Sequence, residues 1–161
     1  MKFDTLLNHI RGTDAPVPGT LLSIDPGHTV GWGLFEDGVL SRAGQIAVDV
    51  SSSGTLGGDS MWELVLDIEP EVIIIENYRI YPHMSKTHTW SSLNTPKLIG
   101  YIEAICQHQG IPYYLQMAST KEFCNNDKLR EWGYYRQGEP HANDAIRHGC
   151  YWLLFGKGRG K

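Results

Sequence analysis

The pattern of apolar and polar residues predicts strands near the start of the chain, and alternating strands and helices after them. Residues 20–25, TLLSID, form an apolar run that is typical of a buried strand. Residues 31–48, GWGLFEDGVLSRAGQIAV, are expected to form a β-hairpin, because Asp37-Gly38 is a favoured two-residue turn. The sequence therefore predicts three consecutive strands.

The middle of the chain is expected to form a helix, a strand and a second helix. Ser60 and Glu63 form a capping box ahead of apolar residues at helical spacing, which predicts a helix there. The β-branched run at residues 71–75, EVIII, is typical of a parallel strand covered on both faces. A helix with Pro96 at its first position is predicted to run to Gln109, because proline favours that position.

The last third of the chain adds one strand and two helices. Residues 111–117 are predicted to form the fifth strand, residues 125–133 a short helix, and residues 141–156 a longer helix that ends at a glycine. The element order is βββαβαβαα, preceded by an amphipathic helix at residues 3–10. This order predicts an α/β fold with a five-stranded mixed sheet, three antiparallel strands and then parallel ones, flanked by helices.

The chain is expected to form one domain with short additions at both ends. Its 161 residues, of which 41% are apolar and 20% charged, suit a single globular unit. We expect an N-terminal extension at residues 1–19, the domain itself at residues 20–156 and a basic tail at residues 157–161.

Apolar runs and cysteines bear on where the protein works. No apolar run is long enough to cross a membrane, and the N-terminus lacks the apolar stretch of a secretion signal, so we expect a cytoplasmic protein. Cys106, Cys124 and Cys150 are odd in number and widely spaced, which predicts reduced, buried thiols rather than disulfides or a zinc site.

The formal net charge of −4 is unevenly distributed along the chain. Residues 1–76 hold 3 basic and 12 acidic residues, and residues 77–161 hold 11 and 6, so the two parts carry −9 and +5. Acidity opposes nucleic-acid binding, since affinity for phosphates comes from Lys and Arg. Two divalent cations would supply +4 and cancel the formal charge, so a DNA partner is not excluded.

Three acidic residues lie at the ends of predicted elements. Asp25 ends the first strand, Glu76 directly follows the EVIII run, and Asp144 lies near the start of the last helix. Each has an ordinary explanation alone, as a turn, strand-end or helix-start residue. If the two strands are parallel neighbours, however, Asp25 and Glu76 lie side by side, and like charges that close need a neutralising cation. Carboxylate oxygens suit Mg²⁺, so the pattern indicates a metal site.

Three motifs, taken together and in this order, resemble those of the RuvC family of Holliday junction resolvases in the ribonuclease H-like superfamily. They are SIDPGHTVGWG at residues 23–33, VIIIEN at 72–77 and HANDAIRHG at 141–149. The resemblance covers Thr20 to Phe155 and implies a ribonuclease H-like fold. The segment between the Asp-Pro-Gly and Gly-Trp-Gly motifs is one residue shorter than in bacterial RuvC, and the N-terminal extension is unusual. Both differences suggest a distant, phage-encoded branch of the family. The protein would then work in the cytoplasm of a bacterial cell or of a phage-infected host.

The resemblance also implies an activity. It implies a crossover junction endodeoxyribonuclease that resolves four-way DNA by paired symmetric nicks, in recombination, repair or phage DNA processing. Hydrolysis of the phosphodiester would use two Mg²⁺ ions per active site, for which Mn²⁺ substitutes. Branched DNA and a second copy of the chain are the implied partners, without a small-molecule cofactor. The helix from Pro96 to Gln109 is the expected dimer interface.

The resemblance assigns Asp25, Glu76, His141 and Asp144 as the catalytic and metal-binding residues. His141 lies one helical turn before Asp144, so both can face one metal. Metal ligation is the first role considered for His141, and proton transfer is the second. His148, one turn further along, is expected to have a structural role against the sheet.

The resemblance implies a DNA-binding surface as well. Lys121 and Lys128 match lysines that neutralise the DNA backbone, although both could be ordinary surface lysines. Tyr78 and Tyr81 lie where the family places an aromatic ring against opened bases, which would stabilise binding by about 1–3 kcal/mol. Packing at the strand end is the alternative for both. The positive surface is expected to include Arg79, Lys86, Lys97, Arg130, Arg136, Lys157, Arg159 and Lys161.

Two other functions stay open on the sequence. One is a ribonuclease H-fold nuclease that acts on RNA or on RNA–DNA hybrids. The other is a junction-binding accessory protein whose catalysis is dispensable, although three carboxylates facing phosphates would not help a protein that only binds DNA.

Overall fold

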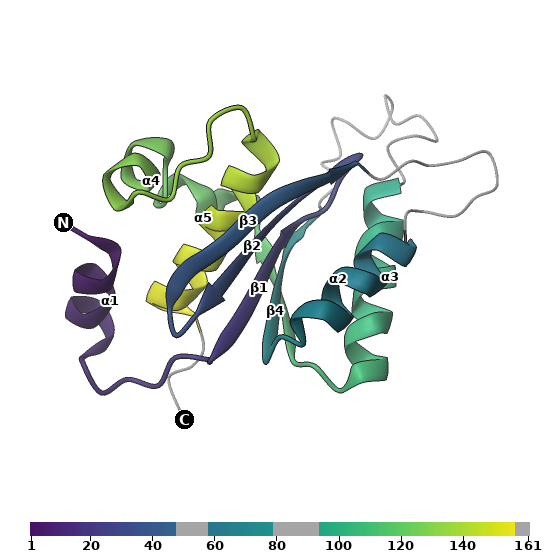
Figure 1. Ribbon diagram of the computed structural model, residues 1–161, viewed down its shortest axis with the longest axis horizontal. Coiled ribbons are helices and arrows are strands. Elements are labelled where there is room, and N and C mark those ends of the chain that lie inside the picture. Colours follow the sequence, from purple (N-terminus) through teal and green to yellow (C-terminus); the bar gives the residue numbers. More distant parts are fainter. Residues whose placement is uncertain (48–57, 79–93, 157–161) are drawn as a thin grey trace.

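The computed structural model describes residues 1–47, 58–78 and 94–156 (Figure 1). Strands and helices follow the predicted order, which is therefore confirmed. The elements are α1 (Phe3–Arg11), β1 (Thr20–Asp25), β2 (Thr29–Glu36), β3 (Val39–Ala47), α2 (Gly58–Ile68), β4 (Val72–Asn77), α3 (Asn94–Gln109), β5 (Tyr113–Met117), the 3₁₀ helix η3 (Ala118–Glu122), α4 (Asn126–Trp132) and α5 (Pro140–Phe155).

The five strands form one mixed sheet in the order β3-β2-β1-β4-β5. The first three strands pair antiparallel, and β4 lies parallel to both β1 and β5, as the sequence predicts. Ile24 of β1 pairs with Ile75 of β4, so the next residue of each strand, Asp25 and Glu76, lies at the same edge of the sheet. This register places the two carboxylates side by side.

Helices cover both faces of the sheet (Figure 1). On one face α2 and α3 pack on Ile73 and Ile75, and on the other α5 and α1 pack over Ile74. Successive side chains of a strand point to opposite faces, so a strand between two helical layers is apolar at every position. This explains the uninterrupted EVIII run and gives the molecule two hydrophobic cores, one on each side of the sheet.

The hairpin between β2 and β3 turns at the predicted pair of residues. Asp37 and Gly38 have φ angles of 50° and 79°, which is the left-handed conformation that a two-residue type I′ turn requires at both positions. The prediction of this hairpin is confirmed.

Two helices begin earlier than the sequence predicts. α2 starts at Gly58, so Ser60 lies inside its first turn and is not the cap. α3 starts at Asn94, which makes Pro96 its third residue instead of its first. Proline fits there because the N–H groups of the first helical turn have no partner within the helix. The sequence signals therefore predict the starts of both helices to within three residues.

The N-terminal segment packs against the domain. Phe3 and Leu7 of α1 are buried, at 2% and 8% exposure, in the core that also contains α5. The ring of Phe3 lies 5.0 Å from that of Trp132, and Arg11 Nη1 donates a hydrogen bond to the carbonyl of Leu153 at 3.1 Å. Residues 1–11 thus contribute to the core on this face of the sheet.

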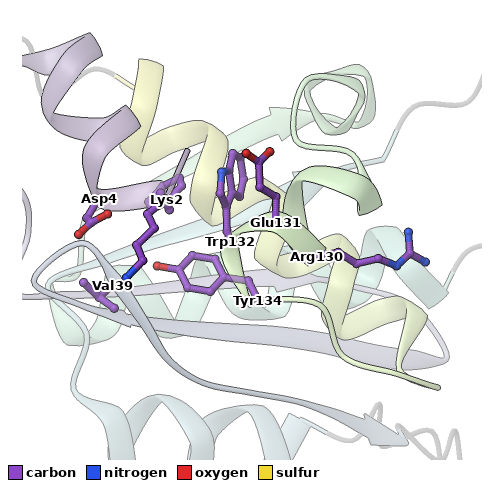
Figure 2. A pocket seen from close by; sticks show the side chains of 9 residues that line it. Lys2, Asp4, Val39, Arg130, Glu131, Trp132 and Tyr134 are labelled. Atoms are coloured by element: carbon purple, nitrogen blue, oxygen red, sulfur yellow. The ribbon is translucent and has the colours of Figure 1, made fainter.

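A cavity of about 370 Å³ lies beside this helix (Figure 2). Trp132 and Tyr134 form part of its wall, and charged side chains surround them. None of the predicted catalytic carboxylates lines it. Its labelled side chains are those of Lys2, Asp4, Val39, Arg130, Glu131, Trp132 and Tyr134.

The three cysteines are free and buried, as predicted. Within residues 1–47, 58–78 and 94–156, no helix combines the length and the apolar character that crossing a membrane requires.

Candidate active site

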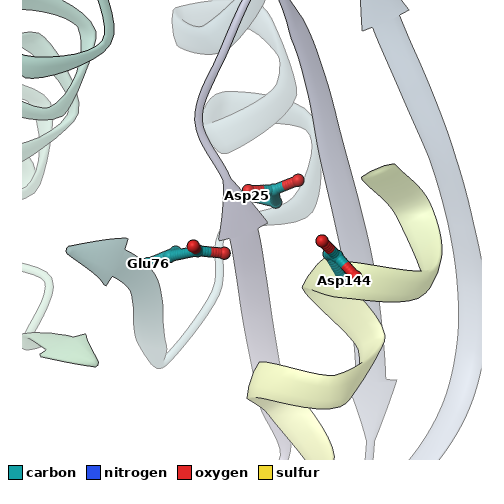
Figure 3. A group of neighbouring side chains, drawn as sticks. All are labelled: Asp25, Glu76 and Asp144. Atoms are coloured by element: carbon teal, nitrogen blue, oxygen red, sulfur yellow. The ribbon is translucent and has the colours of Figure 1, made fainter. Parts of the chain in front are cut away.

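Asp25, Glu76 and Asp144 converge at the carboxyl edge of the parallel strands (Figure 3). Each offers one carboxylate oxygen, and these three oxygens lie within 4.8 Å of one another. The side chains are largely buried, with exposures of 12%, 17% and 29%. The convergence expected from the sequence is therefore found.

A glycine on β2 allows α5 to approach the sheet at this point. Gly31 pairs with Asp25, and a Cβ atom on Gly31 would lie 2.7 Å from the backbone nitrogen of Ala142 and closer still to the carbonyl of His141. No side chain fits there, which explains the first glycine of the Gly-Trp-Gly motif. The backbone N–H of His141 donates to Oε1 of Gln45 on β3 at 2.9 Å, which satisfies one N–H at the start of the helix.

The ammonium group of Lys121 lies between two of the carboxylates. Its Nζ is 2.9 Å from Oε2 of Glu76 and 2.8 Å from Oδ2 of Asp144. Burial lowers the pKa of Lys121, but the hydrogen bonds to Asp144 and Glu76 outweigh burial and leave the pKa raised. The lysine therefore stays charged and partly neutralises the cluster.

The environments of Asp25 and Glu76 shift their pKa values in opposite directions. Burial, and after it the charge of Glu76, raises the pKa of Asp25 to about 8. Burial would also raise the pKa of Glu76, but hydrogen bonds from His148 and Lys121 outweigh it and lower the pKa to about 2. Near neutral pH Glu76 is thus ionised while Asp25 retains a proton.

These residues fit a divalent cation. The three carboxylates are hard oxygen ligands within reach of a single ion. The pKa of Asp25 is raised, so its carboxyl group resists ionisation unless a divalent cation lies beside it. The protein itself places a positive charge, that of Lys121, between two of them.

His141 also faces this cluster. Its Nδ1 lies 3.2 Å from Oδ2 of Asp25, and 45% of its side chain is exposed. A position beside a carboxylate and open to solvent is compatible with both roles considered for His141.

The structure adds several residues that were not predicted for the site. Arg147 Nη1 donates to Oδ1 of Asp144 at 2.9 Å, and its Nη2 donates to the side chain of Asn126. The spacing of three residues between Asp144 and Arg147 is a recognised signal for such a pair. Gln45 and Gln116 have no comparable signal, because they reach the site only through the folding of the sheet.

His148 lies against the sheet, where the sequence places it, and it also contacts Glu76. It is fully buried, and its Nε2 is 3.0 Å from Oε2 of Glu76. Its Nδ1 is 2.9 Å from Oε1 of Gln116 on β5.

The residues predicted to bind DNA have different surroundings in the structure. Lys121 contacts the carboxylates, whereas Lys128 donates a hydrogen bond to the carbonyl of Phe123 at 2.7 Å and lies over its ring. Tyr78 is half-buried against the core beneath α2 and α3. Lys97 is exposed, and Arg130 pairs with Asp127. Arg79, Tyr81, Lys86, Lys157, Arg159 and Lys161 lie outside the described residues.

No family model and no curated protein sequence matches the chain. Solved structures do match. The structure of Thermus thermophilus RuvC in complex with a Holliday junction substrate has a TM-score of 0.66 at 14% identity, covering 84% of this chain and 92% of that one. The yeast mitochondrial Holliday junction resolvase Ydc2 has a TM-score of 0.58 at 15% identity, covering 94% and 84%.

A viral structure matches as well. The complex of the fowlpox virus resolvase with substrate Holliday junction DNA has a TM-score of 0.53 at 12% identity, covering 83% of this chain and 96% of that one. The matches span most of both chains. The chain therefore has the ribonuclease H-like fold of RuvC and of these other Holliday junction resolvases.

Proposed function

We propose that the protein is a metal-dependent endodeoxyribonuclease that resolves four-way DNA junctions by paired symmetric nicks. One observation carries this proposal: Asp25, Glu76 and Asp144 meet at the carboxyl edge of the parallel strands. A binding protein would gain nothing from three carboxylates directed at phosphates. Structures with the same fold were solved with Holliday junction DNA, and this favours a branched DNA substrate.

In this proposal Asp25, Glu76, Asp144 and His141 hold Mg²⁺ ions, two per active site, and Mn²⁺ substitutes. Bound there, divalent cations lower the pKa of water and neutralise charge on the phosphate. Asp25 and Glu76 lie on paired strands of the sheet, so their relative position is fixed by backbone hydrogen bonds. Asp144 is fixed by its ion pair with Arg147.

Lys121 has a second role in this proposal. Among the described residues, its ammonium group pairs with two carboxylates that the cations would bind. Once released from them it lies at the edge of the site, within reach of the DNA backbone. Lys128, Tyr78 and the residues outside the described part of the chain, Arg79, Tyr81 and Lys86, complete the proposed DNA-binding surface.

Two matched cuts require two active sites, so the proposal includes a homodimer that works in the cytoplasm. Helix α3 is the proposed interface, and its Tyr101 is 37% exposed. Light scattering of the wild type and of Tyr101→Glu tests this, since a charge buried at an apolar interface should give monomers. Two forms of equal mass would exclude this position from the interface.

A cleavage assay on defined substrates tests the activity. A synthetic four-way junction, a linear duplex and an RNA–DNA hybrid of matched sequence are incubated with Mg²⁺, and again with a chelator. Symmetric nicking of the junction alone, abolished by the chelator, is the expected result. Preferred cleavage of the hybrid would instead support the ribonuclease alternative, and binding without any cleavage would support an accessory role.

The variant Asp25→Asn ties the activity to the site. It keeps the shape of the side chain but removes the charge that a cation needs, so we expect normal junction binding and roughly 100–1,000-fold slower cleavage, in line with the effect of removing one charge-stabilising group. Wild-type cleavage by this variant would show that the assigned carboxylates are not the catalytic ones.

A further inference from the structure

Three elements of the fold meet behind the carboxylate of Glu76. His148 reaches it from α5, and the same imidazole ring contacts Gln116 on β5. Thr120 of η3 also lies 3.3 Å from Nδ1 of His148 and donates a hydrogen bond to the carbonyl of Met117 at 2.9 Å. A chain of polar contacts thus runs from the cluster to the strand and the turn beside it.

His148 is an unusual residue for its position. It is fully buried, and the side chains about one helical turn away on α5, those of Ala145 and Trp152, are buried and apolar. Burying a polar ring is unfavourable unless its nitrogens find partners, and a leucine would fill the same space without that cost. Here both ring nitrogens have partners, and one of those partners is a residue of the candidate metal site.

The contact constrains how Glu76 presents its oxygens. Oε2 is 3.0 Å from His148 and 2.9 Å from Lys121. The carboxylate is planar, so fixing one oxygen from a buried ring also fixes the direction of the other. The ammonium group of Lys121 ends a long, flexible side chain that can turn away, whereas the ring of His148 is fully buried. His148 alone of the two can therefore hold Glu76 in place when a cation binds.

The contacts of η3 with this network also affect Lys121. Thr120 directly precedes Lys121 in the chain, and it contacts both His148 and Gln116. The network that orients Glu76 therefore also positions the turn from which Lys121 reaches the cluster.

We infer that His148 is a positioning residue that holds the Glu76 carboxylate, through its contacts with β5 and η3, in the orientation that binds the divalent cation. The inference rests on the proposed metal site. It assigns His148 no contact with DNA and no proton transfer. Residues that orient metal ligands typically change metal affinity by about 10–100-fold when they are removed.

Calorimetric titration of the full-length protein with Mn²⁺ tests the inference. His148→Leu keeps the volume but removes both hydrogen bonds, so we expect Mn²⁺ to bind about 10–100-fold more weakly. His148→Gln keeps an amide that can donate to Glu76 and should recover part of the loss. Ile146→Val is the matched control, because it disturbs the buried face of the same helix without touching the polar network, and its Mn²⁺ affinity should equal that of the wild type.

Circular dichroism and thermal unfolding of the metal-free variants separate positioning from folding. A folded His148→Leu protein that binds Mn²⁺ as tightly as the wild type would overturn the inference. So would an equal loss of affinity in Ile146→Val, because packing alone would then explain it. If His148→Leu does not fold, Gln116→Leu decides: it keeps His148 and removes its partner on β5, and unchanged Mn²⁺ affinity would overturn the inference.

Failure of the inference and failure of the proposed function give different results. A protein that binds Mn²⁺ in a His148-dependent way but cuts no junction would retain the inference and overturn the function. A protein that cuts junctions and binds Mn²⁺ independently of His148 would retain the function and overturn the inference. Absence of any Mn²⁺ binding by the wild type would overturn the inference together with the proposed metal dependence.

Discussion

Nζ of Lys121 lies 2.9 Å from Oε2 of Glu76, in the middle of the candidate metal site. It is also 2.8 Å from Oδ2 of Asp144, and only 18% of the lysine side chain is exposed. Lys121 thus neutralises part of the acidic cluster. A divalent cation that binds the same oxygens must displace this ammonium group.

Replacing Lys121 with methionine should therefore strengthen metal binding. Hydrogen bonds between charged groups contribute roughly 1.5–3 kcal/mol, and 1.4 kcal/mol corresponds to a factor of ten, so we expect about tenfold tighter Mg²⁺ binding by calorimetry. Junction cleavage should fall in the same variant, because the phosphate loses a positive charge.

Lys128→Met serves as the control for this change. It removes the same charge from a lysine that contacts Phe123 instead of the carboxylates. Its Mg²⁺ affinity should stay at the wild-type value. Equal affinities in the wild type and Lys121→Met would show that the lysine does not compete with the metal.

Much of the candidate site could be predicted because it depends on strand ends. An apolar β-branched run identifies a strand buried on both faces, and parallel neighbours bring Asp25 and Glu76 to one edge whatever the details of packing. Asp144 was a candidate from its position near the start of the last helix, and the motif resemblance joined it to the other two carboxylates and added His141. These residues are specified by backbone topology, which the hydrophobic pattern records.

The contacts between side chains could not be predicted in this way. His148 meets Gln116 only because of the way α5 packs on the sheet, and nothing in the spacing of residues 116 and 148 records that. Phe3 looked like part of an extension, yet its ring packs against Trp132 from a distant helix. Such contacts depend on how the helices pack on the sheet, and no local pattern in a single sequence records that packing.

Metal binding should release a proton below about pH 8. Burial and the charge of Glu76 raise the pKa of Asp25 to about 8, so below that pH its carboxyl group holds a proton that a cation must expel. Apparent Mg²⁺ affinity should therefore rise with pH and level off above about 8. Calorimetry in buffers of different ionisation enthalpy should count about one proton released at pH 6.5 and almost none near pH 9.

The raised pKa of Asp25 also determines how the stability of the folded protein depends on pH when no metal is bound. The pKa of Asp25 is higher in the folded protein than its ordinary value of 3.8, so its contribution to stability is lost as the pH rises from about 4 to about 8. Glu76 acts in the opposite sense, but only below its ordinary value of 4.5. Thermal unfolding with chelator should give a lower midpoint at pH 8 than at pH 6, and a flat profile in Asp25→Asn.

The N-terminal helix should matter for stability. Phe3 is 2% exposed and packs on Trp132 and Tyr134, so Phe3→Ala should lower the free energy of unfolding by about 3 kcal/mol in urea denaturation. Leu66→Ala removes an apolar side chain that is 45% exposed on α2, and should change it by no more than about 0.5 kcal/mol. Equal effects of the two changes would mean that α1 does not stay packed in solution.

Gly31 should tolerate no side chain, because it sets the distance between β2 and the start of α5. A methyl group there would meet backbone atoms of His141 and Ala142, which cannot rotate away. We expect Gly31→Ala to destabilise the protein by at least ~1–3 kcal/mol, the usual effect of overpacking, and to weaken Mg²⁺ binding because Asp144 moves with the helix.

Gly100→Ala makes the same chemical change in α3, where a Cβ would meet nothing within 4 Å. Since alanine is the better helix former, this change should stabilise the protein by about 1 kcal/mol and leave the metal affinity as it is. Chemical denaturation of the two variants should therefore give stability changes of opposite sign, and calorimetry should show weaker metal binding in Gly31→Ala alone. A Gly31→Ala protein with wild-type stability and metal affinity would show that α5 can move away from β2 without disturbing the carboxylates, and that their convergence does not depend on this close approach.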